Sequence, residues 1–279
     1  MSHRTYHELT GEDRSALASQ VAEQRQKVVE RLSSVKNTIA VMSGKGGVGK
    51  SYVTAGLSLE LARKLSGSIG VLDADLNSPT AVGMLGASGR VRITEDGVEP
   101  VAGRDGVLVM SSGLLLDDGQ PLRWRGPNSE QFVWRGTLET GTLREFLGDV
   151  KWGSLETLLI DLPPGSGSIA DLANLVPDLT GALAVTIPSA ESEHSVERTV
   201  RVAIEHGIRL LGIVENMSSY LCSSCGEMGP LFDGSAGRRL ADKFGVPLLA
   251  RLPFQTKQDG PEPTPEVAGL ADAIVEMLQ

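Results

Sequence analysis

Nine consecutive residues have the types and spacing needed to bind a nucleotide phosphate. They read Gly-Lys-Gly-Gly-Val-Gly-Lys-Ser-Tyr and follow the apolar run Ile39–Met42. Phosphate binding needs several converging backbone N–H donors, and glycines let the main chain approach closely. This is the P-loop pattern when a strand precedes it and a helix follows it. The expected nucleotide contacts are Gly44, Lys45, Gly46, Gly47, Val48, Gly49, Lys50, Ser51 and Tyr52.

Two of these residues have distinct chemical roles in the P-loop pattern. Lys50 would neutralise the β- and γ-phosphates of ATP, which makes it a candidate catalytic residue, and the Ser51 hydroxyl would hold Mg²⁺. The helix that begins here would also direct the positive end of its dipole at the phosphates. A structural glycine turn is the alternative, but it leaves the Lys-Ser pair unexplained.

Carboxylates follow the ends of two further predicted strands. Asp161 ends the run Leu-Leu-Ile-Asp, which has the Walker B form, and such a carboxylate holds Mg²⁺. Asp75 is the candidate for positioning the hydrolytic water, because phosphoryl transfer depends on orientation and charge compensation. Asp73 is either a second contact to Mg²⁺ or a structural residue. A turn-capping role is the alternative for Asp161.

A fourth strand end carries an asparagine. The apolar run Leu210–Val214 leads into Glu215 and Asn216. In an open parallel sheet, ligands bind beyond the carboxyl ends of the strands, so we expect Asn216 to share one edge with the P-loop and the carboxylates. Its amide offers one donor and one acceptor suited to the edge of adenine. A structural asparagine at a strand end fits the residue equally well.

The only two cysteines, Cys222 and Cys225, follow the same strand. Their Cys-x-x-Cys spacing suits two thiolates that converge on one metal centre. A structural zinc site or a [4Fe–4S] cluster takes four ligands, and no histidine lies nearby in the sequence to complete a set. A stable four-thiolate site therefore requires two copies of the chain. A thiol–disulfide redox pair is one alternative, and two thiols with no special role are the other.

The elements that position these residues alternate between strands and helices. This alternation predicts an α/β fold with a doubly wound, mostly parallel sheet. Residues 37–279 are expected to form one P-loop ATPase domain, and residues 1–36 an N-terminal helical extension that packs on it or docks a partner. Helices are expected over about 50–65, 128–149, 189–206, 235–244 and 265–278, and strands near 39–42, 69–73, 98, 107–110, 156–160, 181–188, 210–214 and 247–252.

Composition excludes several classes of protein. The 33 glycines in 279 residues exceed the usual share of about 7%, as expected of a fold with many tight loops. A formal charge of −9 gives no basic surface, which disfavours nucleic acid as a partner. No apolar run approaches the roughly 20 residues of a membrane span, and the first residues lack an apolar signal region. We therefore expect a cytoplasmic protein that binds no membrane.

Further motifs occur in a fixed order within residues 36–265. They are Asp-Ala-Asp at 73, Trp-Arg-Gly-Pro at 124, Asp-Val-Lys-Trp-Gly at 149, Ile-Asp-Leu-Pro-Pro-Gly-Ser-Gly at 160, Val-Glu-Asn-Met-Ser at 214 and Cys-x-x-Cys-Gly at 222. With the additional lysine of the P-loop, Lys45, this set resembles the Mrp-type iron–sulfur carrier ATPases. They belong to the deviant Walker A (SIMIBI-like) group with the MinD, ParA and nitrogenase iron-protein ATPases. MinD-like and ParA-like proteins lack the Glu-Asn-Met…Cys-x-x-Cys-Gly block.

The resemblance implies a homodimer or a heterodimer that binds and hydrolyses ATP, and we expect a homodimer. It also implies a [4Fe–4S] cluster bridged between subunits and delivered to apo iron–sulfur proteins. By position, Lys45 would reach the partner's nucleotide as a catalytic residue, and Asn216 would contact adenine. Cys222 and Cys225 would ligate the cluster.

This sequence departs from the family pattern at three places. The family glycine after Asp-Ala-Asp is missing from Asn77-Ser-Pro-Thr80, Ser168 replaces an acidic residue, and the usual glycine cluster is reduced to Asp233-Gly-Ser-Ala-Gly-Arg238. These changes bear on hydrolysis rate, switch movement and partner choice.

Two other functions stay open. The first is a MinD- or ParA-like positioning ATPase, which leaves the cysteines unexplained; against it, the predicted C-terminal helix of this chain has no basic amphipathic face for a membrane. A zinc-stapled, nucleotide-dependent scaffold uses the same four thiolates.

Overall fold

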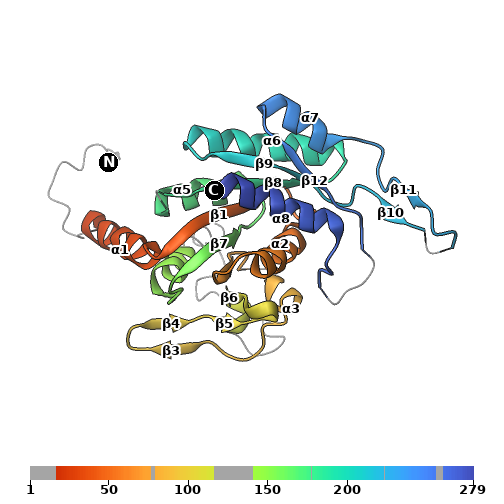
Figure 1. Ribbon diagram of the computed structural model, residues 1–279. Coiled ribbons are helices and arrows are strands. Elements are labelled where there is room, and N and C mark those ends of the chain that lie inside the picture. The colour runs from red at the N-terminus through yellow and green to blue at the C-terminus, as the bar shows by residue number, and fades with distance from the viewer. Residues whose placement is uncertain (1–16, 77–78, 116–140, 177, 223, 256–259) are drawn as a thin grey trace, which may run out of the picture.

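The fold is built on an eight-stranded sheet, seven strands of which run parallel (Figure 1). The computed structural model describes residues 17–279 except 77–78, 116–140, 177, 223 and 256–259. The edge strand β5 pairs antiparallel with β6. In spatial order the strands are β12 (Leu248–Arg251), β9 (Leu210–Glu215), β8 (Gly181–Thr186), β1 (Val35–Ser43), β7 (Leu155–Asp161), β2 (Ile69–Asp73), β6 (Leu108–Ser111) and β5 (Val101–Ala102).

Helices cover both faces of this sheet, because its central strands are apolar on both sides. In β1, Ile39 and Val41 join one apolar core and Ala40 and Met42 join the other, as expected when successive side chains alternate. The first core is completed by α2 (Lys50–Lys64), α3 (Ala81–Met84) and α8 (Pro265–Leu278). The second is completed by α1 (Leu17–Leu32), the helical residues 141–149, α5 (Ser166–Leu175), α6 (Ala190–Glu205) and α7 (Ala236–Phe244).

Two short hairpins extend from this sandwich of layers. The strands β3 (Arg92–Thr94) and β4 (Gly97–Glu99) form one, and β10 (Tyr220–Leu221) and β11 (Met228–Gly229) form the other, at the right of Figure 1. Two 3₁₀ turns, η2 (Arg104–Gly106) and η3 (Ser112–Leu114), flank β6. The second hairpin carries both cysteines, so it belongs to the functional description below.

The predicted fold class, a doubly wound and mostly parallel α/β sheet, is confirmed. The described helices and strands match most predicted ranges within a few residues. Several elements were not predicted: the short helix α3, the strands β3, β5, β10 and β11, and the helix α5, which begins at Ser166 directly after Pro-Pro-Gly. The motif at 124–127 and most of the predicted helix 128–149 lie outside the described residues.

The N-terminal helix α1 packs on the sheet layer. Its Val28 is fully buried in the second core, Arg31 donates to the carbonyl of Gly148, and Lys27 pairs with Asp149. Only two residues separate α1 from β1. The division of the chain into an extension and a domain at residue 36 stays a prediction. Within the described ranges, no helix is long and apolar enough to cross a membrane.

Candidate nucleotide site and cysteine hairpin

The P-loop connects the central strand β1 to α2. Gly47 and Gly49 both have φ of +78°, a left-handed conformation that only glycine adopts freely. Gly44 meets a different demand, because a Cβ there would lie 2.1 Å from the carbonyl carbon of Ser195 in α6. The loop is thus folded tightly between β1, α2 and α6. The strand–loop–helix context required by the P-loop pattern is present.

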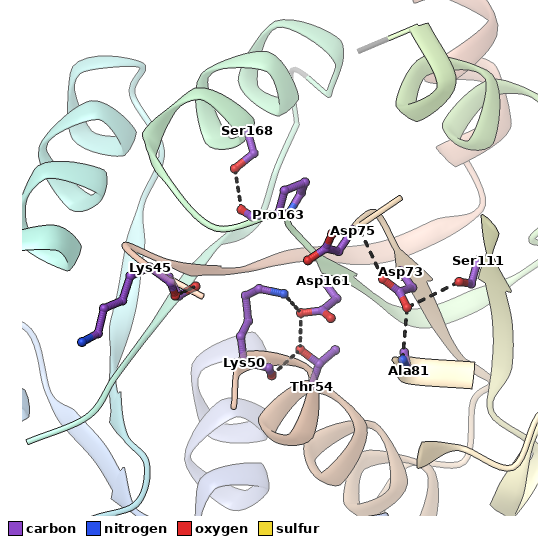
Figure 2. A network of polar contacts seen from close by, with 11 residues as sticks. Lys45, Lys50, Thr54, Asp73, Asp75, Ala81, Ser111, Asp161, Pro163 and Ser168 are labelled. Carbon is purple, nitrogen blue, oxygen red and sulfur yellow. Dashed lines mark hydrogen bonds and ion pairs between the residues drawn. The ribbon is translucent and has the colours of Figure 1, made fainter. Parts of the chain in front are cut away.

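The P-loop lysine lies in a buried polar network at the carboxyl end of β7 (Figure 2). Lys50 Nζ lies 2.5 Å from Asp161 Oδ1, and the two side chains are 6% and 0% exposed. Thr54, one helical turn after Lys50, donates to the same oxygen at 3.1 Å. The other carboxylate oxygen, Asp161 Oδ2, is buried and has no hydrogen-bond partner among the described residues. An unpaired buried oxygen suits a Mg²⁺ ion with its water ligands.

The second buried carboxylate, Asp73, lies beside Asp161 in the neighbouring strand. Its oxygens accept the N–H groups of Asp75 at 3.2 Å and Ala81 at 3.1 Å, and Ser111 Oγ lies 3.4 Å away. Burial, and then the Asp161 carboxylate, raise the pKa of Asp73 to about 7, while the two N–H donors oppose the rise. These bonds fix the turn after β2, so they favour the structural role for Asp73.

A pocket of about 230 Å³ opens over the P-loop. Besides loop residues, it is lined by Asp75, Thr80, Met84 and Pro164. The Tyr52 hydroxyl is buried beside it and has no hydrogen-bond partner among the described residues. Burial, and then the Glu262 carboxylate, raise the pKa of Tyr52, so the phenol keeps its proton at neutral pH and can donate a hydrogen bond. A bound polar ligand would satisfy this hydroxyl.

The extra lysine of the loop does not join this network. Figure 2 shows the Lys45 side chain pointing away from Lys50 and Asp161. Its charge instead helps to lower the pKa of Glu191, a shift caused chiefly by backbone and Ser189 hydrogen bonds to that carboxylate. The Lys45 ammonium therefore faces outward on the P-loop side of the molecule.

Asn216 meets the P-loop from the end of β9. It is 3% exposed, and its Nδ2 donates to the carbonyl oxygen of Val48 at 2.9 Å. A Cβ added at Gly49 would lie 2.2 Å from that nitrogen, so the loop glycine permits the close approach. The sequence placed Asn216 at this edge but did not predict its bond to the loop.

The cysteines lie six and nine residues further on, in the β10–β11 hairpin. The Cys222 N–H donates to the Glu227 carbonyl, and the Gly226 N–H donates back to the Cys222 carbonyl, both at 2.9 Å. Backbone N–H groups of Cys225 and Ser224 lower the pKa of the Cys222 thiol. Cys222 is half-buried and Cys225 is exposed, and no third metal-binding side chain joins them within the described part of the chain. Within the described residues, the chain thus offers two thiols at this hairpin and no third ligand beside them.

Comparison with known proteins decides the family. Residues 34–265 match the ParA family model, described as the NUBPL iron-transfer P-loop NTPase. The chain belongs to this family. An iron–sulfur cluster carrier protein of Saccharolobus solfataricus is 35% identical over 91% of this chain and 88% of its own length. The cytosolic Fe-S cluster assembly factor CFD1 of Chaetomium globosum is 40% identical over 80% of this chain and 76% of its own length.

A solved structure agrees with this family. The nucleotide-binding protein from Archaeoglobus fulgidus in complex with ADP shares 34% identity and has a TM-score of 0.67. The match covers 89% of this chain and 90% of that one. Together with the family model, this confirms the resemblance inferred from the motifs and the P-loop NTPase fold.

The structure brings most predicted site residues to one edge of the sheet. The P-loop, Asp73, Asp75, Asp161 and Asn216 all follow carboxyl ends of parallel strands. Sequence reasoning missed Thr54, although its position one turn after Lys50 places both on the same helix face. It also missed Ser111, whose contact with Asp73 depends on the pairing of β2 with β6.

Proposed function

We propose that this chain is an ATPase that carries a [4Fe–4S] cluster in a homodimer and delivers it to apo iron–sulfur proteins. One observation carries the proposal. A paired-thiol hairpin follows the same strand, β9, whose end contacts the nucleotide loop. Family membership supports ATP as the nucleotide and the cluster as cargo. Hydrolysis coupled to cluster transfer is part of the proposal.

The P-loop pocket supplies the parts needed for Mg²⁺ and ATP. The loop N–H groups and Lys50 would hold the phosphates, and the Ser51 hydroxyl and Asp161 Oδ2 would hold Mg²⁺. Asp75 lines the pocket and would orient the attacking water. Bound Mg²⁺ would compensate charge on the phosphates. Asp73 stays a predicted Mg²⁺ contact, although its oxygens already accept backbone N–H bonds.

Two residues would act beyond the phosphates. The outward direction of Lys45 supports a contact with the partner's nucleotide rather than with its own. Because Nδ2 of Asn216 binds Val48, the carbonyl oxygen of its amide would be the group that accepts a hydrogen bond from adenine.

The surroundings of the cysteines support a partner at this hairpin. Backbone donors favour the Cys222 thiolate, and thiolates are the ligands of iron–sulfur clusters. Two thiols per chain fill half of a four-ligand site, so a second copy would complete it. Exposed apolar side chains flank the pair, and ten large ones occur among the described residues. Those in the hairpin, directly after it or bridged to it are Tyr220, Leu221, Met228, Leu231, Phe232 and Phe254.

The names of relatives bear on where the protein works. Several are cytosolic assembly factors, which supports a cytoplasmic location for this chain. An N-terminal extension that ends near residue 36 is proposed to pack on the ATPase domain through α1.

Anaerobic reconstitution with ferrous iron and sulfide tests the proposal. We expect about four iron atoms per dimer with the absorption of a [4Fe–4S] cluster. Cys222→Ser and Cys225→Ser should each lose the cluster and keep the fold. Ser219→Ala is the matched control, because it changes the same hairpin without removing a thiol. A monomer with a complete cluster, or a dimer that takes up only zinc, contradicts the proposal and favours the zinc-stapled scaffold.

A further inference from the structure

The connection between the P-loop and the cysteine hairpin is short and continuously bonded. At its start, the Asn216 N–H donates to the Thr186 carbonyl at 2.8 Å, while its side chain donates to Val48. The preceding Glu215 is 1% exposed, and its carboxylate accepts bonds from Gly237 N at 2.7 Å and Arg251 Nε at 2.9 Å. The end of β9 is therefore fixed to its neighbours.

Beyond Asn216, the chain is tied to the segment that follows β12. Ser218 donates from both its N–H and its hydroxyl to the carbonyl of Leu252, at 2.9 and 3.0 Å. The Phe254 N–H donates to the Ser219 carbonyl at 2.7 Å, and Tyr220 forms a parallel bridge with Phe254. Residues 218–221 and 252–254 thus form a small ribbon that ends at Cys222.

One residue between the fixed strand and this ribbon is strained. Met217 has φ of +54°, a left-handed conformation that is costly for a residue with a side chain. Its Cε lies 3.6 Å from the place that a Cβ at Gly49 would occupy, so it approaches the same loop glycine as Asn216 does. The P-loop therefore lies against Asn216 at the end of the fixed strand and against Met217, the strained residue from which the ribbon begins.

We infer that Asn216 is a positioning residue that links the nucleotide loop to the cysteine hairpin, so that nucleotide binding changes the exposure of the two thiols. The inference rests on the proposed function, since it needs a nucleotide in the P-loop. Phosphate binding turns loop N–H groups inward, which moves the neighbouring Val48 carbonyl. A buried amide that loses its acceptor is unfavourable, so Asn216 follows Val48. Met217 can then relax, and the ribbon shifts with Cys222.

Such a link works in both directions. If nucleotide binding changes the affinity of the hairpin for a metal, metal binding must change the affinity of the loop for the nucleotide by the same factor. Couplings of this kind usually change an equilibrium by about fivefold or more. That size is measurable from thiol chemistry alone, without a cluster on the protein.

The experiment measures iodoacetamide alkylation of the metal-free, reduced, full-length chain with and without saturating ADP. The chain has only two cysteines, so mass spectrometry assigns every product to Cys222 or Cys225. We expect ADP to change the alkylation rate of wild type by about fivefold or more. In Asn216→Ala and the milder Asn216→Ser, the change should fall below about twofold. Asn174→Ala, on the exposed side of α5, is the matched control and should respond as wild type does.

Calorimetry in parallel measures the ADP affinity of each variant, which confirms binding and gives the ADP concentration needed for saturation. Two protein concentrations separate a change within one chain, which does not depend on concentration, from shielding by dimer formation, which does. Three results overturn the link. The first is an unchanged alkylation rate in wild type with ADP bound, and the second is an equal response in wild type and the Asn216 variants. The third is a response that scales with protein concentration. Loss of ADP binding in both Asn216 variants assigns the residue to the nucleotide alone and also overturns it. Wild type that binds no nucleotide contradicts the proposed function instead.

Discussion

The buried pair between Lys50 and Asp161 gives a quantitative prediction about stability. Asp161→Asn keeps the shape of the side chain and removes its charge, so the Lys50 ammonium stays buried without a counter-ion. Breaking a buried pair in this way costs about 3–5 kcal/mol of unfolding free energy. We expect the lower end, because the new amide oxygen still accepts hydrogen bonds. In addition, Asp73 loses the like charge that helps to raise its pKa.

The change in melting temperature follows from the size of the chain. At roughly 2 cal/mol/K of unfolding entropy per residue, 279 residues give about 0.6 kcal/mol/K. A loss of about 3 kcal/mol therefore lowers the melting temperature by about 5 °C. Thr54→Val is the control, since it removes one hydrogen bond to Asp161 and leaves the ion pair. It should cost about 1 kcal/mol, or about 2 °C.

Thermal unfolding without nucleotide, with ADP, and with ADP and Mg²⁺ is the assay. ADP alone should stabilise Asp161→Asn at least as much as wild type, because the phosphates supply the anion that Lys50 has lost. The further gain from Mg²⁺ should be smaller in the variant, since Asp161 is the proposed contact to the ion. An Asp161→Asn protein that melts no lower than Thr54→Val would refute the reasoning about the pair.

Three further predictions follow from the site and its surroundings. Lys45→Ala should lower ATP turnover with little change in ATP affinity, whereas Lys50→Ala should lose affinity. The reason is that the Lys50 ammonium lies against Asp161 beneath the P-loop, while the Lys45 side chain points away from both residues. Equal losses of affinity speak against this division. Tyr52→Phe removes an unpaired buried hydroxyl, so without nucleotide the melting temperature should stay the same or rise slightly. The same change should weaken ADP binding about fivefold to tenfold in calorimetry. Unchanged affinity shows that the hydroxyl does not contact the ligand. Hydrogen bonds from Lys243 and then Arg201 lower the pKa of Glu197 to about 2. The Glu197 carboxylate therefore contributes to stability above its usual pKa of 4.5, and this contribution is lost as the pH falls from 4.5 toward 2. Glu197→Gln should flatten the decline of melting temperature in that range, and a parallel decline in both proteins excludes the contribution.

The sequence predicted those parts of the site that are local in the chain. The P-loop and the Walker B run are short motifs, each tied to one strand end. Residue types and spacing therefore suffice to predict that Lys50 contacts phosphate and that Asp161 holds Mg²⁺, and both roles stay predictions. The parallel sheet then places their strand ends together. Their direct contact at 2.5 Å needs the pairing of β1 with β7, which no local pattern specifies.

The missed features depend on tertiary contacts. α5 begins directly after Pro-Pro-Gly, residues that usually mark a loop, and it is held by burial of Ile169, Leu172 and Leu175. Their spacing of three was a readable helical signal. Ser168 takes part in this start, since its hydroxyl donates to the carbonyls of Pro163 and Gly165. The bond from Asn216 to Val48 joins residues 168 positions apart, so no sequence pattern could indicate it.

The close approach of Gly44 to α6 has a consequence for genetic suppression. A side chain at Gly44 would strike the main-chain carbonyl carbon and oxygen of Ser195 and the main-chain nitrogen of Val196. These atoms are present whatever amino acids occupy the two positions, so no exchange at either one restores the space. At Gly49 the obstructing atom is the side-chain nitrogen of Asn216, so a second mutation there relieves the clash and leaves only the strain of the left-handed φ of +78°. A screen for intragenic suppressors should therefore recover none in α6 for Gly44→Ala.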